Sequence, residues 1–224
     1  RKNISVFRID GAHGKVYSNL LKKIKIPTLI ITDIDFKRDS SLLKKTTKNK
    51  DGSEITTESF PQMEEIDSST ETTNATLSHF LGSNKVFNYP KHYVSDNIYL
   101  SYQLDKISIN ISESQNHHYY ATSFEEAFIL ENFENKLLRR VLLKIIGKDY
   151  TDIISEEPKD NYILAMNSFK IQKKLSDSKS DFANSIIYEL ITSDEIKPVL
   201  PSYILKGLSW LICHERKPGE KDYV

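Results

Sequence analysis

Residues 28–35 read TLIITDID, an apolar run that ends in two aspartates, Asp33 and Asp35. An apolar run of this length without alternation is typical of a strand covered on both faces, as in a parallel sheet flanked by helices. Before it, residues 15–25 carry apolar side chains at helical spacing, and Ile4–Ile9 (ISVFRI) is apolar and β-branched. Strand, helix and strand in this order predict a βαβ unit with two parallel strands, and therefore an α/β fold.

The rest of the chain predicts an inserted loop followed by short strands and several helices. Residues 37–72 are rich in Lys, Ser, Thr and Glu, which indicates a polar insertion. Thr73 or Asn74 is expected to cap a short helix that ends at Gly82. Further strands are predicted at residues 98–104 and 107–111, and helices at residues 124–147, 162–175, 181–191 and 202–213. We therefore expect a core of residues 1–36 and 73–150, an inserted loop of residues 37–72 and a helical C-terminal part of residues 151–224.

The composition excludes several broad classes of protein. With 38% hydrophobic residues and no apolar run near the ~20 residues of a membrane span, the chain is expected to be soluble. The single cysteine, Cys213, cannot form an internal disulfide, so we expect a cytoplasmic protein, with this side chain in the core. A net charge of +0 argues against a globally basic nucleic-acid binder. Because the chain starts at Arg1 close to a strand-like run, we interpret it as a fragment of a longer protein.

Asp33 and Asp35 are the strongest chemical signal from the residues themselves. In an α/β sheet, ligands gather outside the carboxyl ends of parallel strands, which is where this pair is expected. In extended chain the two side chains would point to the same side, about 7 Å apart. Carboxylate oxygens at that spacing suit Mg²⁺ or Mn²⁺. The alternative is that two acids simply begin a solvated loop. Metal binding by the adjacent His117 and His118 is a weaker possibility, since such a pair is more often exposed.

Five stretches of the chain resemble a known family of nucleases. Residues 4–35 resemble the Toprim domain of the overcoming-lysogenization-defect (OLD) family of ATP-dependent endonucleases, closest to the branch of the Gabija-type anti-phage nucleases. The other matching stretches follow in the family's order, at residues 73–77 (TNATL), 121–132 (ATSFEEAFILEN), 178–183 (SKSDFA) and 201–211 (PSYILKGLSWL). The resemblance implies a Toprim-like parallel sheet flanked by helices, and a divalent-metal-dependent enzyme that hydrolyses DNA phosphodiester bonds.

The resemblance also implies roles for individual side chains. Asp33, Asp35 and Glu125 would be metal ligands for Mg²⁺ or Mn²⁺, and the carboxylate of Glu125 should then lie within about 8 Å of an aspartate. Lys179 would neutralise negative charge that develops on the scissile phosphate. Without the resemblance, Glu125 would be interpreted as an acid that offsets a helix dipole, and Lys179 as an ordinary exposed lysine.

Two residues beside Glu125 belong to the same predicted helix start. Ser123 is expected to cap the helix or to contact a phosphate. Glu126 is the alternative ligand, because the sequence does not decide the register between the two adjacent glutamates.

The resemblance implies partners outside this chain. Members of the family carry an ABC-type ATPase domain upstream in the same polypeptide, and no phosphate-binding GxxxxGK[ST] motif occurs here. We expect DNA as substrate, a homo-oligomer, a helicase-like partner protein and no membrane association. The family also has an acidic motif with an essential glutamate before the position of Ile4, which this chain does not contain.

Two rival functions follow from the same observations. One is a different Toprim chemistry, that of a topoisomerase or primase, although none of the 12 tyrosines stands out as catalytic. The other is a catalytically incomplete Toprim-fold module that serves binding or assembly in a defence complex. The missing glutamate motif keeps this second alternative open.

Overall fold

The structure is a computed structural model that describes residues 4–9, 11–39, 41, 43–48, 53–112, 115–155 and 162–214. The chain divides into two compact units. Unit 1 consists of residues 1–36, 66–104 and 202–224, and unit 2 of residues 37–65 and 105–201. The boundary after residue 36 coincides with the start of the expected insertion. The boundaries after residues 65, 104 and 201 differ from those expected from the sequence.

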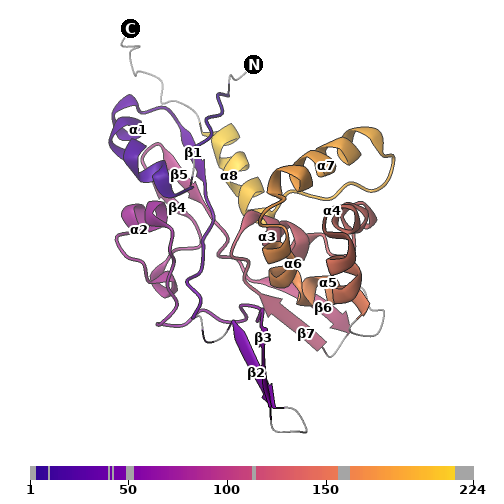
Figure 1. The fold of residues 1–224 in the computed structure, drawn as a ribbon. Helices are drawn as coiled ribbons and strands as arrows, with labels where there is room; N and C mark the ends of the chain where they lie inside the picture. The colour runs from indigo at the N-terminus through magenta and orange to yellow at the C-terminus, as the bar shows by residue number, and fades with distance from the viewer. Residues whose placement is uncertain are drawn as a thin grey trace. The chain divides into compact units, whose positions relative to one another are not determined.

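Unit 1 contains a three-stranded sheet and three α-helices among the described residues (Figure 1). Its elements are η1 (Gly11–Tyr17), α1 (Ser18–Ile24), β1 (Thr28–Ile31), α2 (Ala75–Leu81), η2 (Val86–Asn88), β4 (Tyr93–Ser95), β5 (Ile98–Ser101) and α8 (Ser202–Cys213). The strand order is β1-β5-β4, with β1 parallel to β5 and β4 antiparallel to it. The expected α/β class with a parallel strand pair is therefore observed.

The partner of β1 differs from the one predicted. Residues 4–9 form no strand, and Val6 and Phe7 are 89% and 83% exposed. The prediction of a strand there, and of a βαβ unit built on it, is wrong. The strand that pairs with β1 is β5, in register from Thr28 opposite Ile98 to Ile31 opposite Ser101. A β-branched run favours a strand only where it is paired and covered, and β5, which is buried along its whole length, satisfies that condition.

Helix α8 covers the sheet of unit 1 at close range. Gly207 faces Leu29 on β1 and Ser101 on β5, and a Cβ atom at this glycine would lie 2.6 Å from Leu29 Cδ1 and 3.2 Å from Ser101 Cβ. The hydroxyl of Ser101 donates a hydrogen bond to the carbonyl of Tyr203 (2.6 Å). Glycine thus allows the helix backbone to approach the strands. The helix has the predicted bounds, but Cys213 is exposed, so its predicted core position is wrong.

Other helix predictions are confirmed with changes at their ends. Asn74 caps α2 by accepting from the backbone N–H groups of Thr76 (2.9 Å) and Leu77 (3.1 Å), and Gly82 ends it with φ 73°. The helix predicted at residues 15–25 is an α-helix only from Ser18, because η1 precedes it.

Unit 2 contains two antiparallel hairpins and five helices among the described residues. Its elements are β2 (Lys44–Lys48), β3 (Glu54–Glu58), β6 (Ile107–Ser112), β7 (Gln115–Tyr119), α3 (Phe124–Glu131), α4 (Lys136–Ser155), α5 (Ile163–Met166), α6 (Ser168–Lys174) and α7 (Lys179–Thr192). His117 and His118 lie in β7, which pairs with β6; His118 is exposed, as expected for such a pair, and His117 is partly buried.

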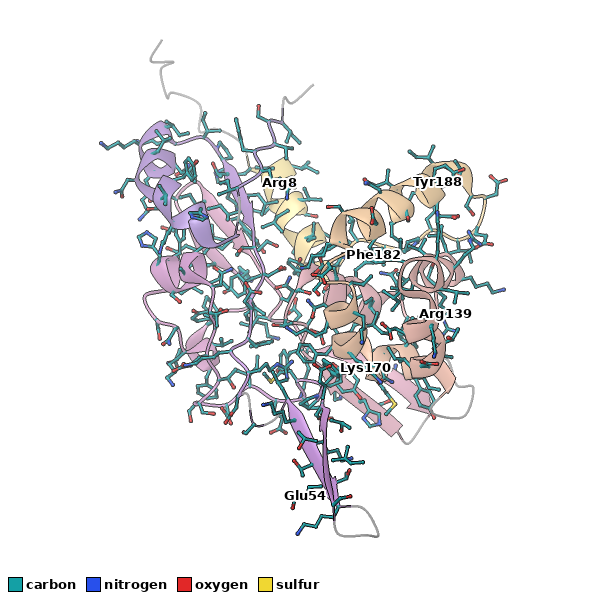
Figure 2. The ribbon with its side chains drawn as sticks, viewed as in Figure 1. Arg8, Glu54, Arg139, Lys170, Phe182 and Tyr188 are labelled. Carbon is teal, nitrogen blue, oxygen red and sulfur yellow. The ribbon has the colours of Figure 1, made fainter. Side chains whose placement is uncertain are left out.

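The segment predicted as an unstructured insertion contains the hairpin of β2 and β3. Every residue of both strands is exposed, and Figure 2 shows Glu54 on this ribbon. Lys44 is opposite Glu58 and Lys48 is opposite Glu54, and the latter pair forms a salt bridge of 3.6 Å. Strands held by polar cross-strand pairs lack the apolar alternation that reveals most hairpins, which is why this hairpin was missed.

A hydrophobic core joins the helices of unit 2. Phe182 on α7 is 1% exposed and packs edge-on against Phe128 of α3, with ring centroids 6.2 Å apart, whereas Tyr188 on the same helix is 61% exposed (Figure 2). The helix predicted at residues 124–147 is two helices, since the side chain of Asn135 accepts from Leu138 N–H (3.0 Å) and starts α4 separately. The helix predicted at residues 162–175 is likewise divided into α5 and α6.

No helix among the described residues combines the length and the apolar character that crossing a membrane requires.

The close contact at Gly207 predicts a stability effect. Alanine has the higher helix propensity by ~1 kcal/mol, but its methyl group would overlap Leu29 and press on Ser101. We expect Gly207→Ala to lower the free energy of unfolding by about 1–3 kcal/mol, the usual cost of overpacking, measured by urea denaturation. Ser209→Ala, at an exposed position of the same helix, is the control and should be close to neutral. A stabilised Gly207→Ala protein would contradict the contact.

Candidate active site

Asp33 and Asp35 follow β1 at its carboxyl end, as predicted. Ile34 between them is fully buried, while Asp33 is half-buried and Asp35 is exposed. The strand ends at Ile31, and Asp35 has a left-handed backbone with φ 48°. The prediction that both aspartates lie on extended chain is therefore wrong. The buried Ile34 anchors the segment instead, and the chain turns sharply at Asp35.

Asn74 binds the backbone that leaves β1. It is 3% exposed, and its side-chain amide donates to the carbonyl of Asp33 (2.7 Å) and to the hydroxyl of Thr32 (2.8 Å). The oxygen of the same amide caps α2. One side chain thus joins the start of a helix to the aspartate segment. The sequence predicted the cap but not the second role.

Two threonines before Asn74 hold the next residues of the segment. The hydroxyl of Thr72 donates to the carbonyl of Ile34, and Thr73 donates to the carbonyl of Asp35 from its N–H (2.9 Å) and from its hydroxyl (3.2 Å). These carbonyls lie past the end of β1, and the two threonine hydroxyls and the Thr73 N–H, beside an isolated antiparallel bridge between Phe36 and Thr72, satisfy them. In the sequence, only the family resemblance of residues 73–77 indicated that this segment has a role at the site.

Gln103, which the sequence analysis did not single out, contacts the carboxylate of Asp33. Its side-chain N–H donates to Asp33 Oδ1 (2.7 Å), and its carbonyl oxygen accepts from the N–H of Ile34 (2.8 Å). The side chain is 3% exposed. Asp33 is therefore oriented by a buried neutral donor.

In unit 2, Glu125 and Lys179 form an ion pair. Glu125 lies in the first turn of α3 and is 8% exposed, and Lys179 is the first residue of α7. The distance between Lys179 Nζ and Glu125 Oε2 is 3.1 Å. The sequence alone favoured a free exposed lysine, whereas the structure gives it a largely buried carboxylate partner. Ser123 caps α3, its hydroxyl accepting from the N–H of Glu126 (3.4 Å).

Glu126 points into unit 2, away from solvent. It is fully buried, and its carboxylate accepts from the N–H of Thr122 (2.7 Å) and from the hydroxyl of Ser168 (3.4 Å). Burial raises the pKa of Glu126 to about 7, while these hydrogen bonds and the charges of Arg38 and Lys173 act in the opposite direction. Of the two adjacent glutamates, Glu125 pairs with the lysine and Glu126 is part of the interior.

The two ends of the inserted segment are anchored close to Glu126. The guanidinium of Arg38 lies over the ring of Phe169, 4.3 Å from its centroid, and donates to the carbonyl of Pro61 (3.0 Å). The amide of Gln62 donates to Ser168 (2.8 Å) and to the carbonyls of Ala165 and Met166 (3.0 and 2.9 Å). Burial lowers the pKa of Arg38, and the nearby Glu126 raises it. The exposed hairpin is thus attached to the helices through these polar contacts and through the stacking of Arg38 on Phe169.

The donor set in unit 1 fits a hard divalent cation. Mg²⁺ keeps several waters and is commonly held by one or two carboxylates, so two aspartates at a strand end are sufficient protein ligands. Within the described residues, no group of three or more His, Cys, Asp or Glu side chains is arranged to hold a metal ion. Glu125 belongs to unit 2 and the aspartates belong to unit 1, and the expected proximity of Glu125 to the aspartates stays a prediction.

The chain is similar to a known family of domains and to a known endonuclease. Residues 1–35, which include both aspartates, match the family model described as overcoming lysogenization defect protein-like, TOPRIM domain. The chain is also 42% identical over 210 residues to Endonuclease GajA of Bacillus cereus (strain HuB5-5). The resemblance to the OLD family is confirmed. The match covers 93% of this chain but 27% of that relative, so the chain spans about a quarter of the relative's length. No solved structure matches the chain.

The buried Glu126 predicts a dependence of stability on pH. Its folded-state pKa of about 7 exceeds the ordinary value of 4.5, so the folded protein holds this proton more tightly than the unfolded chain does. The contribution of protonated Glu126 to the free energy of unfolding is fully present below about pH 4.5 and is lost as the pH rises through about 7. The loss corresponds to about 3 kcal/mol.

Glu126→Gln keeps the shape and an acceptor for Thr122 but cannot ionise. Urea denaturation at pH 5 and pH 8 should show that the wild-type protein loses stability relative to this variant at the higher pH. Glu134→Gln, at an exposed position beyond α3, is the control and should change little at either pH. A difference between wild type and Glu126→Gln that is the same at both pH values would contradict the burial of an ionisable carboxyl.

Proposed function

We propose that this chain is the nuclease part of a divalent-metal-dependent DNA endonuclease in an anti-phage defence system. The observation that carries the proposal is the pair Asp33 and Asp35 at the end of β1, on a segment that side chains of Asn74, Thr72, Thr73 and Gln103 hold by hydrogen bonds. It is supported by the match of residues 1–35 to an OLD-like Toprim domain and by the similarity to an endonuclease.

In this proposal Asp33, Asp35 and Glu125 hold Mg²⁺ or Mn²⁺, and Ser123 is a further candidate contact for a phosphate. A divalent ion bound by these oxygens would activate water and stabilise the leaving oxygen of the phosphodiester. Glu126 is not proposed as a ligand, because it is fully buried and bonded to Thr122 and Ser168.

Lys179 has a separate role in the proposed reaction. Its ammonium is a compact cation suited to the charge that develops on the phosphate during cleavage. Glu125 and the helix start of α7 fix the place of the lysine. The ion pair thus provides both a metal-ligating carboxylate and a positioned cation.

The wider organisation belongs to the same proposal. The mixed sheet of unit 1 is part of a Toprim-like parallel sheet flanked by helices, and the complete protein carries an upstream ABC-type ATPase domain, forms a homo-oligomer and acts with a helicase-like partner. DNA affinity comes from local basic groups and from neighbouring domains, since the chain itself is neutral, and it should weaken as salt increases.

The metal ligands are tested by single substitutions in the intact protein. Asp33→Ala and Asp35→Ala should each abolish Mg²⁺-dependent nicking of supercoiled DNA while leaving the protein folded. Asp96→Ala is a matched control for Asp35, since Asp96 is also exposed and has a similar left-handed φ of 51°. Nicking by Asp35→Ala at the wild-type rate would overturn the assignment and favour a binding or assembly module.

Lys179 is tested by separating binding from turnover. A cation that acts mainly in the transition state should affect the rate far more than the affinity for DNA. We expect Lys179→Ala to bind DNA nearly normally and to nick it roughly a hundredfold to a thousandfold more slowly, equivalent to about 3–4 kcal/mol. Lys179→Arg should restore only part of the rate.

Lys174→Ala is the matched control for Lys179, because Lys174 is a similarly exposed lysine with a carboxylate partner, Asp149, at 3.6 Å. Its nicking rate should be close to wild type. If Lys179→Ala and Lys174→Ala cut equally fast, Lys179 is an ordinary surface residue.

A further inference from the structure

Gln103 uses all of its side-chain hydrogen-bonding groups inside unit 1. It lies just beyond β5 and is 3% exposed. Its oxygen accepts from the N–H of Ile34 (2.8 Å), and its nitrogen donates to Asp33 Oδ1 (2.7 Å) and to the hydroxyl of Tyr203 (2.9 Å). The chemistry of the partners decides the orientation of the amide, because a backbone N–H needs an acceptor and an ionised carboxylate needs a donor.

Gln103 makes two contacts with the segment that follows β1, one with its backbone and one with a side chain. The contact with Ile34 fixes the backbone between the two aspartates, and the contact with Asp33 fixes the rotation of its carboxylate. Because Gln103 binds both the backbone of Ile34 and the carboxylate of Asp33, the direction in which the other oxygen of that carboxylate points is restricted. Groups that hold a ligand in this way commonly change metal affinity about 10–100-fold when removed.

Tyr203 holds Gln103 from the opposite side. It lies in the first turn of α8 and is 5% exposed. The hydroxyl of Tyr203 accepts a hydrogen bond from the side-chain N–H of Gln103, and its carbonyl accepts one from the hydroxyl of Ser101. These two bonds attach α8 to β5 and to the segment after β5. The C-terminal helix therefore contributes to the orientation of an aspartate that precedes it by most of the chain.

We propose that Gln103 is a positioning residue for Asp33 and Asp35, and that Tyr203 on α8 fixes the orientation of Gln103. The proposal rests on the proposed function, because it assigns the positioning to a divalent-cation site. Neither residue touches the reacting atoms. Their effect passes through the aspartates, so it should appear in the affinity for the bare cation as well as in catalysis.

The test uses Mn²⁺ alone as the probe, titrated into the intact protein and followed by the EPR signal of the free ion. Gln103→Met has a similar length but no donor or acceptor, and it should weaken Mn²⁺ binding by about 10–100-fold. In DNA nicking measured over a range of DNA concentrations, it should lower kcat more than it raises KM. Tyr203→Phe removes one hydroxyl only and should weaken Mn²⁺ binding by a smaller factor, roughly threefold to tenfold.

Asn97→Leu is the control for a purely structural effect. Asn97 is 6% exposed, stands directly before β5, and donates to the carbonyls of Leu21 and Ile26, away from the aspartates. This variant should lose stability as Gln103→Met does, yet bind Mn²⁺ as the wild type does. Melting temperatures identify the conditions in which every variant is folded. If Gln103→Met does not fold, Tyr203→Phe decides the outcome.

Asp33→Ala in the same series separates the two ways of failing. If wild type and Asp33→Ala bind Mn²⁺ equally, the proposed metal site itself is wrong. If Asp33→Ala loses binding while folded Gln103→Met and Tyr203→Phe bind as wild type, the metal site stands and the positioning role is overturned.

Discussion

The segment that leaves β1 needs hydrogen-bond partners that a sheet no longer provides, and much of unit 1 is arranged to supply them. Asn74, Thr72 and Thr73 bind its carbonyls, and Gln103 binds the N–H of Ile34. Because buried backbone groups without partners are costly, this segment stays fixed only while all of these contacts are made. Helix α2, strand β5 and helix α8 are thereby coupled to the two aspartates.

At the start of α3 in unit 2, two adjacent glutamates have different surroundings. Adjacent residues on a helix point in different directions, so Glu125 meets Lys179 while Glu126 enters the interior beside Ser168 and Arg38. The buried glutamate lies where the inserted segment is anchored, and the half-accessible ion pair lies one residue away. One helix turn thus holds a structural carboxyl and a candidate catalytic one.

The sequence predicted those features that depend on neighbours in the chain. The strand at residues 28–31, the Asn74 cap, the Gly82 end of α2 and the bounds of α8 follow from local signals. Gln103, by contrast, acts on Asp33 from a distant part of the chain, and no local pattern marks it. Residues 4–9 have the composition of a strand but not the pairing, and pairing is set by competition between distant segments.

In the proposed site, Asp33 and Asp35 together bind a divalent cation. Anomalous scattering from crystals of the intact protein soaked in Mn²⁺ tests it most directly. We expect a manganese peak roughly 2 Å from carboxylate oxygens of both Asp33 and Asp35. Manganese bound elsewhere, with both of these carboxylates outside its coordination sphere, would contradict it.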